Sequence, residues 1–365
     1  MVSCQIYLYL ILKKEYRVLK LHTDIREACS EWDKIKLNDF LEINVLEVYY
    51  KMHPELKHLF FIDDNMRLYA HIFKLRFNKA NNYLIKRSLA YIIVRFISFD
   101  ILYLTNSFIT NISSFISTKD IDLQKLLNII NFNYSIIVIP DFLFKKMRVV
   151  YNEYIKIEVE EEMIIDIRRD WKTFQGYIYD LRKKYRNNIK RIIRKTSILD
   201  SRELDSNELK VYASDIQQLF NQVITTSRFS GPDFNTESFS LLAGQGFMKV
   251  YGYFLKDKIV GFSSEIHQNK IMYSYYVGFD TSLNKSVPIY GRILIDHIKN
   301  SIKKGNKKLV LGRTANEYKS NFGATPVKSF VYLKIKNKFL AILLRPLLFK
   351  LNIRGWVKRS PFKKK

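Results

Sequence analysis

Cysteine is scarce in this sequence. Only Cys4 and Cys29 occur among 365 residues, too few for a disulfide framework or for a set of four thiolates around zinc. The six histidines show no metal-ligand spacing, and His53 and His58, five residues apart beside Pro54, do not fit one helical face. We therefore expect a reducing compartment and no metal site.

A signal peptide and a long uncharged apolar run are also missing. The apolar stretch Ile6–Leu12 has no basic residue before it and no small-residue cleavage site after it. Arg95 and Asp100 interrupt the apolar region Leu89–Ile109, and both charges are costly inside hydrocarbon. We interpret this region as buried strands and expect a cytoplasmic protein, with peripheral association with the inner face of the membrane left open.

Acidic residues are under-represented, and most of all near the C-terminus. The chain has 61 Lys and Arg against 35 Asp and Glu, a net charge of +26. Glu317 is the last acid, and the 48 residues after it contain thirteen Lys and Arg. A polyanionic partner is one interpretation. Compositional drift in a chain rich in Lys, Ile, Asn, Tyr and Phe is the other.

Apolar residues make up 47% of the chain, enough for packed cores, and the length favours two domains. The expected organisation is an N-terminal extension (1–37), a first domain (38–165), a second domain (166–335) and a basic amphipathic tail (336–365). Each domain shows the same order: a hairpin, a strand, a helix and a further strand. In the first, this predicts a helix at 38–51, a hairpin at 59–62 and 66–77, strands at 92–96 and 101–104, a helix at 120–131 and a strand at 135–139. In the second, it predicts helices at 171–195, 209–228 and 237–245, a hairpin at 247–255 and 259–267, a strand at 271–278, a helix at 288–303, a strand at 308–311, a helix closing at Gly323 and a last strand at 327–335.

Two basic segments have alternative interpretations. The stretch Trp171–Lys195 predicts one long helix or two in series, and its part Arg182–Lys195 has eight basic residues and no acid. One interpretation is a helix that binds phosphates, a membrane surface or nucleic acid. The other is a solvated helix on which the aliphatic parts of the Lys and Arg side chains cover apolar surface. The tail Asn337–Lys365 mixes apolar and basic residues around Pro346, which favours either a helix on an anionic bilayer or a helix packed on the protein itself.

Three segments carry a resemblance to a known group: Leu181–Lys190, Met272–Asp280 and Gly312–Ala324. With the repeated element order they resemble the tandem GNAT-fold acyltransferases, which include the Fem-type peptidyltransferases of peptidoglycan cross-bridges and related peptidoglycan biosynthesis proteins. The resemblance covers about residues 38–335 and implies an α/β fold of two GNAT-like domains with mixed, mostly antiparallel sheets. It implies a mainly structural first domain and a catalytic second domain that transfers an acyl or aminoacyl group to an amine of a cell-envelope or other anionic precursor, free or lipid-linked.

The sequence departs from that group at two places. Enzymes that use acyl-CoA hold its pyrophosphate on a glycine-rich loop at a helix N-terminus, whereas the loop Asp280–Tyr290 lacks Gly-x-Gly and offers Lys285, Ser286 as helix cap, and Pro288. The helical arm of Fem-type enzymes is absent between Leu199 and Phe247. Acyl-CoA or aminoacyl-tRNA therefore remains open as co-substrate, neither of them tightly bound.

The candidate catalytic residues lie on two successive predicted strands. Acyl transfer needs a base for the amine proton and a donor for the oxyanion. Glu265 is the candidate base, and it shares a strand face with Ser263 and His267. The alternative is an ordinary strand carboxylate that faces solvent. Tyr275 is a candidate acid, and the alternative is that its ring only packs against neighbouring side chains. We expect Tyr275 and Tyr276 on opposite faces of the strand. Asp280, at the strand end, is a site residue or a turn cap.

The candidate substrate-binding residues are Arg313, Lys319 and Arg186. Arg313 follows an apolar strand, and its planar guanidinium suits phosphate or carboxylate. The alternative is a local ion pair with Glu317, one turn later, with Lys319 as a solvated neighbour. A second function also stays open: a non-catalytic membrane-surface or nucleic-acid-binding module, including tRNA, on a decayed GNAT core.

Overall fold

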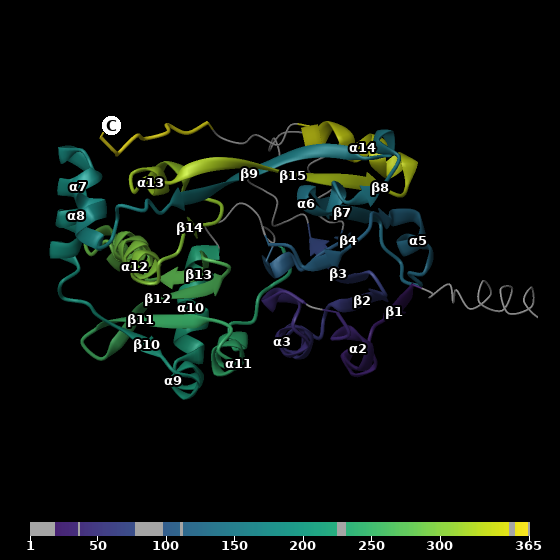
Figure 1. The fold of residues 1–365 in the computed structure, drawn as a ribbon, viewed down its shortest axis with the longest axis horizontal. Coiled ribbons are helices and arrows are strands. Elements are labelled where there is room, and N and C mark those ends of the chain that lie inside the picture. The colour runs from purple at the N-terminus through teal and green to yellow at the C-terminus, as the bar shows by residue number, and fades with distance from the viewer. Residues whose placement is uncertain are drawn as a thin grey trace, which may run out of the picture.

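The strands of both halves join in one sheet (Figure 1). The computed structural model describes residues 19–35, 37–76, 98–109, 112–224, 231–349 and 355–363, and within these a 13-stranded sheet runs through the molecule. The strands follow the order β1 (Lys20–His22), β2 (Lys57–Asp63), β3 (Met66–Arg76), β4 (Ser98–Tyr103), β7 (Ile136–Pro140), β15 (Thr325–Ile335), β9 (Ile155–Asp166), β14 (Lys308–Val310), β13 (Ile271–Phe279), β12 (Lys258–Gln268), β11 (Lys249–Leu255) and β10 (Asp200–Leu204), while β5 (Phe115–Ser117) pairs with β3.

The order of the sheet is mirrored about its centre. On one side the hairpin β2–β3 leads to β4, which pairs in parallel with β7; on the other the hairpin β11–β12 leads to β13, which pairs in parallel with β14. The other neighbouring pairs in this sheet are antiparallel. The predicted α/β class, the mixed and mostly antiparallel sheet and the repeated element order are thus confirmed. The residue boundaries of the two domains stay a prediction.

The two long central strands tie the halves together. β15 pairs with β9 from Thr325 to Leu333 and with β7 from Val331 to Ile335, while the far end of β9 pairs with β14. The acidic run Glu158 to Glu162 lies half-buried in the middle of β9.

The helices flank the sheet. Those described are α2 (Ile25–Trp32), α3 (Ile43–Met52), α5 (Leu123–Asn128), α6 (Asp141–Phe144), α7 (Phe174–Asp180), α8 (Lys183–Lys195), α9 (Ser206–Val211), α10 (Ala213–Ile224), α11 (Ser238–Gly244), α12 (Ile289–Lys303), α13 (Asn316–Ser320) and α14 (Lys338–Phe349). Short 3-10 helices are η1 (Asp39–Leu41), η3 (Ser107–Ile109), η4 (Tyr151–Glu153) and η5 (Leu283–Lys285), and β6 (Ile121–Asp122) pairs with β8 (Met147–Arg148).

Some of the predicted helices and strands are present as expected, and others are divided in the structure. Both predicted hairpins are present, and Trp171–Lys195 forms two helices in series, α7 and α8. The predicted helix at 38–51 is divided into η1 and α3, and that at 209–228 into α9 and α10. The strand predicted at 92–96 lies outside the described residues.

The segment before residue 38 takes part in the first half. β1 pairs with β2, and α2 buries Ile25, Ala28 and Trp32 in a cluster with Phe60. The Arg67 guanidinium, 2% exposed, donates to the backbone oxygen of Trp32 at 2.8 Å. These contacts join α2 firmly to the sheet.

The C-terminal tail packs on the body of the protein at two places. Leu344 of α14 is buried beside β15, and residues 355–363 return to the other end of the molecule (Figure 1). There the N–H of Arg182 donates to the carbonyl oxygen of Pro361, and that of Lys363 to Asp180, each at 2.9 Å. Among the described residues, no helix is long and apolar enough to cross a bilayer.

Candidate functional site at the junction of the halves

The candidate site lies where the parallel strands β13 and β14 stop pairing. Ile271–Tyr273 of β13 pair with Lys308–Val310 of β14. Beyond Tyr273, β13 continues to Phe279 paired with β12, and the chain beyond β14 turns into the loop Gly312–Ala315. Ends of parallel strands in α/β sheets are common positions for site residues.

The loop Gly312–Ala315 has a strained backbone. Gly312, Thr314 and Ala315 have φ angles of 70°, 66° and 51°, in the left-handed region that Thr and Ala rarely adopt. The Nζ of Lys319 on α13 donates to the carbonyl oxygens of Gly312 at 3.1 Å and Arg313 at 2.7 Å. The amine thereby stabilises the conformation that presents Arg313.

Lys319 is itself an unusual cation. Its side chain is almost completely buried, and this burial lowers its pKa to about 7, although the carboxylates of Glu160 and Glu162 on β9 act in the opposite direction. Near neutral pH the amine therefore exists in both protonation states, a property of groups that exchange protons in catalysis. The interpretation of Lys319 as a solvated neighbour was wrong, because α13 turns its side chain inward.

Arg313 acts electrostatically on Tyr103 of the first half. It is half-buried, and its charge lowers the pKa of Tyr103 on β4, which burial raises to a net value of about 12. The charge of Glu162 acts on both Tyr273, whose pKa burial raises, and Lys319. These five side chains, which we call the junction site, come from β4, β9, β13, the loop after β14, and α13.

Sequence reasoning found Arg313 and Lys319 but missed Tyr103 and Glu162. Glu162 belongs to the acidic run of β9, and the residues on which its charge acts, Tyr273 and Lys319, lie far along the chain. Tyr103 carried no local signal, because it occurs in an apolar strand of a tyrosine-rich sequence. Glu317 pairs with Arg359 from the C-terminal segment.

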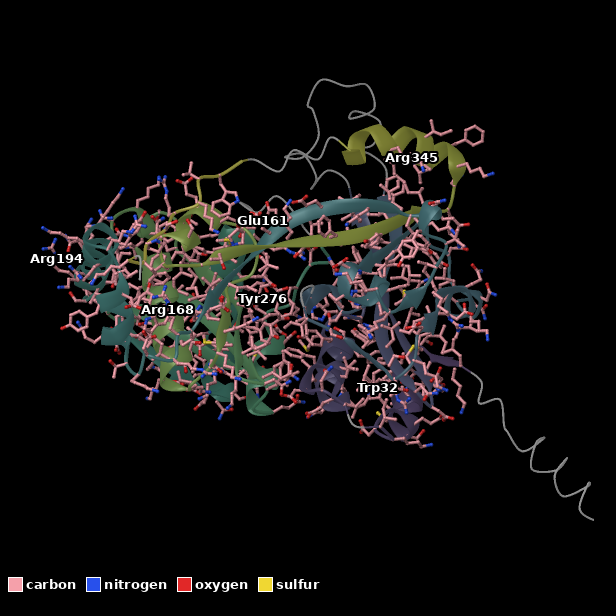
Figure 2. All side chains as sticks on the ribbon, turned by 45° about the horizontal axis from the view of Figure 1, so that its top comes forward. Trp32, Glu161, Arg168, Arg194, Tyr276 and Arg345 are labelled. Carbon is pink, nitrogen blue, oxygen red and sulfur yellow. The ribbon has the colours of Figure 1, made fainter. Side chains whose placement is uncertain are left out.

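A cluster of aromatic side chains surrounds Tyr275. Its hydroxyl lies 3.0 Å from that of Tyr49 on α3, and its ring lies 4.3 Å from the ring of Tyr276. Phe234 and Phe108 pack on the same cluster. Tyr276 is seen near the middle of the molecule in Figure 2. Burial raises the pKa of Tyr275 well above 10, so its hydroxyl keeps its proton at neutral pH.

The expectation that Tyr275 and Tyr276 point to opposite faces was wrong. The pairing of β12 with β13 shifts between Ser263 and Glu265, so both tyrosines lie opposite Ser264. The Ser264 hydroxyl bonds to the backbone N and O of Tyr276, at 2.8 and 2.9 Å. This β-bulge interrupts the alternation of side chains.

Glu265 lies beneath α12. It is 1% exposed; Asn300 Nδ2 donates to Oε1 at 2.7 Å, His267 Nε2 lies 3.2 Å from Oε2, and His297 Nε2 lies 3.9 Å from Oε1. The solvent-facing interpretation was therefore wrong. The contact with His267 agrees with the shared strand face, whereas the partner Asn300 was not foreseen. The role of Glu265 as base stays a prediction.

The loop before α12 tests the fit of an acyl-CoA pyrophosphate. Asp280 caps the turn, accepting from the N–H groups of Ser282 and Leu283 at 2.9 Å, and Asn284 Oδ1 accepts from Tyr290 at 3.0 Å. Carbonyls of the loop take further N–H groups, those of Asn284, Ser286, Val287 and Ile289. These donors are thus engaged before any ligand arrives.

Side chains also cover this helix end. A Cβ on Gly291 would lie 2.6 Å from the Tyr318 hydroxyl, and the Tyr318 ring stacks on Tyr290 at 5.5 Å. Lys285 and Ser286 are exposed, but Ser286 donates to Leu283 O, so the prediction that it caps α12 was wrong; Pro288 occupies that position. The loop does not fit a pyrophosphate cradle.

Arg186 lies on α8, apart from the junction site. α8 buries Ile189 and Ile192 and packs against α12, while its exposed side chains are basic or Asn187. Arg194 marks this helix at one end of the molecule (Figure 2). None of the ion pairs found among the described residues involves a basic side chain of α8. Among the same residues, no group of His, Cys, Asp and Glu could hold a metal.

Comparison with known proteins supports the resemblance. Residues 182–320 match the family described as acetyltransferase (GNAT) domain. This part of the chain is similar to a GNAT domain. The sequence has no match among the curated proteins.

Solved structures extend the fold likeness to the first half. L-PGS from Bacillus licheniformis has 9% identity and a TM-score of 0.52, over 93% of this chain and all of that one. A conserved protein of unknown function from Bacteroides thetaiotaomicron has 10% identity and a TM-score of 0.50, over 87% and 100%. FemX has 9% identity and a TM-score of 0.47, over 89% and 99%. The predicted resemblance to GNAT proteins is confirmed at the level of the fold.

Proposed function

We propose that the protein transfers an acyl or aminoacyl group to an amine at the junction site. The observation that carries this proposal is the buried Lys319, with a pKa of about 7, which holds the Arg313 loop where β13 and β14 part within the segment that is similar to a GNAT domain. A structural ion pair would need neither the lowered pKa nor the strained loop.

In this reaction the amine nitrogen attacks the carbonyl carbon of an ester or thioester. A C–N bond forms, the C–O or C–S bond breaks, the amine loses a proton and the leaving group gains one. Arg313 binds an anionic group of a substrate, and Lys319 exchanges a proton near neutral pH. Tyr275, which keeps its proton, is a hydrogen-bond donor for the oxyanion or the leaving group.

The acceptor we propose is a cell-envelope or other anionic precursor, free or lipid-linked, met in the cytoplasm or at the inner membrane face. The net charge of +26 and the half-buried Arg313 support an anionic acceptor. For the donor, the engaged N–H groups before α12 argue against a CoA pyrophosphate at that loop. The activity assay offers aminoacyl-tRNA and acyl-CoA in turn as the donor.

Substitution of Arg313 by Lys tests the proposal. The variant keeps the charge but loses the planar pair of donors, so we expect kcat/KM to fall by about tenfold to a hundredfold. The measurement is the donor-dependent mass gain of an acceptor amine, with each donor class in turn. Arg202→Lys, on the remote edge strand β10, is the control and should retain full activity. Equal activity of the two variants would remove Arg313 from the site.

A non-catalytic polyanion-binding module is the alternative. The closed loop before α12 and the basic side chains of α8 favour it. Binding of RNA through phosphate contacts loses affinity steeply with salt. Such binding, together with no mass gain from any donor, would favour this alternative over acyl transfer.

A further inference from the structure

Helix α14 exposes apolar side chains on its outer face. Phe339 is 85% exposed and Ile342 is 71% exposed, whereas Leu344 on the inner face is 1% exposed and Leu340 packs against the core. Burying the inner face against β15 explains why the helix forms, but it does not explain the outer apolar pair. Apolar side chains that project together from one helix mark interaction sites.

Basic side chains flank this apolar pair. Lys336, Lys338 and Arg345 are exposed beside Phe339 and Ile342. No ion pair found among the described residues involves Lys338 or Arg345, and the chain has no acid after Glu317. The outer face of α14 is therefore apolar and cationic together.

We propose that α14 docks the protein on an anionic lipid surface. Phe339 and Ile342 enter the boundary between headgroups and acyl chains, and the basic groups contact lipid phosphates. Helix α14 has 12 residues, about 18 Å of helix, so it lies along the surface. The proposal goes beyond acyl transfer and does not depend on it, since either property can be present alone.

A contrast within the molecule favours lipid over nucleic acid as the occupant of α14. The exposed side chains of α8 are basic or Asn187, which suits a phosphate backbone without apolar insertion. α8 and α14 lie at opposite ends of the molecule, marked by Arg194 and Arg345 in Figure 2. The two surfaces can therefore be altered separately.

Vesicle flotation with the full-length protein tests the proposal. We expect binding to vesicles that contain phosphatidylglycerol, weaker binding at high salt, and little binding to phosphatidylcholine alone. The double variant Phe339→Ser, Ile342→Ser should lose at least about tenfold in partition coefficient. Val211→Ser removes an equally exposed apolar side chain, 76% exposed on α9, and should bind like the wild type.

A charge exchange separates the two basic surfaces. Lys338→Glu with Arg345→Glu should reduce vesicle binding by more than about twentyfold, at about fivefold or more for each charge. Lys183→Glu with Arg194→Glu on α8 should leave vesicle binding unchanged. Thermal unfolding checks that each variant is folded, since all these side chains are exposed.

Several outcomes would overturn the proposal. These are no flotation of the wild type, equal loss in the Val211→Ser control, or loss of binding only when α8 is altered. Self-association seen by light scattering, abolished by Phe339→Ser with Ile342→Ser, would instead assign the surface to a second copy of the chain. Loss of acyl transfer with vesicle binding intact would count against the proposed function alone.

Discussion

Lys319 is the residue on which sequence and structure differ most. In the sequence it is one of many lysines in a basic C-terminal region, but in the structure its amine is buried and donates to the two carbonyls that shape the Arg313 loop. Glu265 follows the same pattern, a strand carboxylate that proves to be 1% exposed beneath α12. In both cases packing between segments that are distant in the chain removes the charge from water: α13 against β9 for Lys319, and α12 against β12 for Glu265.

Replacing Lys319 by Met should change how stability depends on pH. The folded-state pKa of about 7 lies below the ordinary value of 10.5, so between these values the unfolded state binds more protons and wild-type stability rises with pH. The free energy of unfolding of the wild type relative to Lys319→Met should therefore increase from about pH 7 to about pH 10. Urea unfolding at both values measures it. The exposed Lys303→Met serves as control, and a constant difference for Lys319→Met would contradict the burial of the amine.

At the scale of elements, the C-terminal segment 355–363 braces the site. Phe362 packs against Trp171 with ring centroids 5.3 Å apart and lies under the Arg168 guanidinium at 4.4 Å. Arg359 pairs with Glu317, and its N–H donates to the Ser320 hydroxyl on α13 at 3.1 Å. The segment thus holds the helix that carries Lys319.

A double-mutant cycle tests this brace. Gly323 has a φ of 95°, and a Cβ there would lie 2.3 Å from the Phe362 ring. Gly323→Ala should therefore destabilise by the backbone cost of about 1 kcal/mol plus a steric term. In a Phe362→Ala background the steric term should vanish, which gives a coupling of about 1 kcal/mol or more in urea unfolding. Additive effects would show that Phe362 does not occupy this position in solution.

At the scale of the whole molecule, His53 links the two halves, and the buried His58 and His71 lie within the first half. His53 Nδ1 bonds to Tyr49 O at 3.1 Å, while its Nε2 accepts from the Asn235 N–H of the second half at 3.1 Å. His58 Nδ1 lies 2.7 Å from the Tyr69 hydroxyl, and His71 Nε2 lies 2.6 Å from the Ser107 hydroxyl. Because one nitrogen of His53 must accept, that ring is neutral in the folded protein.

Mild acid should therefore destabilise the protein. Burial lowers the pKa of His53 and His58 from 6.5 to about 4, and it lowers the pKa of His71 well below 6.5. Between pH 6.5 and 4 the unfolded state binds protons that the folded state does not bind. The free energy of unfolding therefore falls as pH decreases from 6.5 toward 4. Urea midpoints across this range measure the slope. His53→Gln, which keeps an acceptor for Asn235, should reduce it, and an unchanged slope would exclude His53 as a contributor.

The sequence alone determined what depends on local periodicity and turn chemistry. These features are the α/β class, the two hairpins, the helices α8 and α12, and the repeated order of elements that accompanies the GNAT resemblance. Alternation along a strand and apolar spacing along a helix are set by neighbouring residues, so they can be interpreted without the fold.

Only the tertiary structure decided which distant residues meet. The joining of the halves through β9 and β15, the bulge at Tyr275, the burial of Lys319 and the docking of Phe362 depend on contacts between segments far apart in the chain. Burial changes the free energy of a charge far more than its neighbours in sequence do. The junction site of Arg313, Lys319, Tyr103, Tyr273 and Glu162 therefore became visible only when these strands were brought side by side.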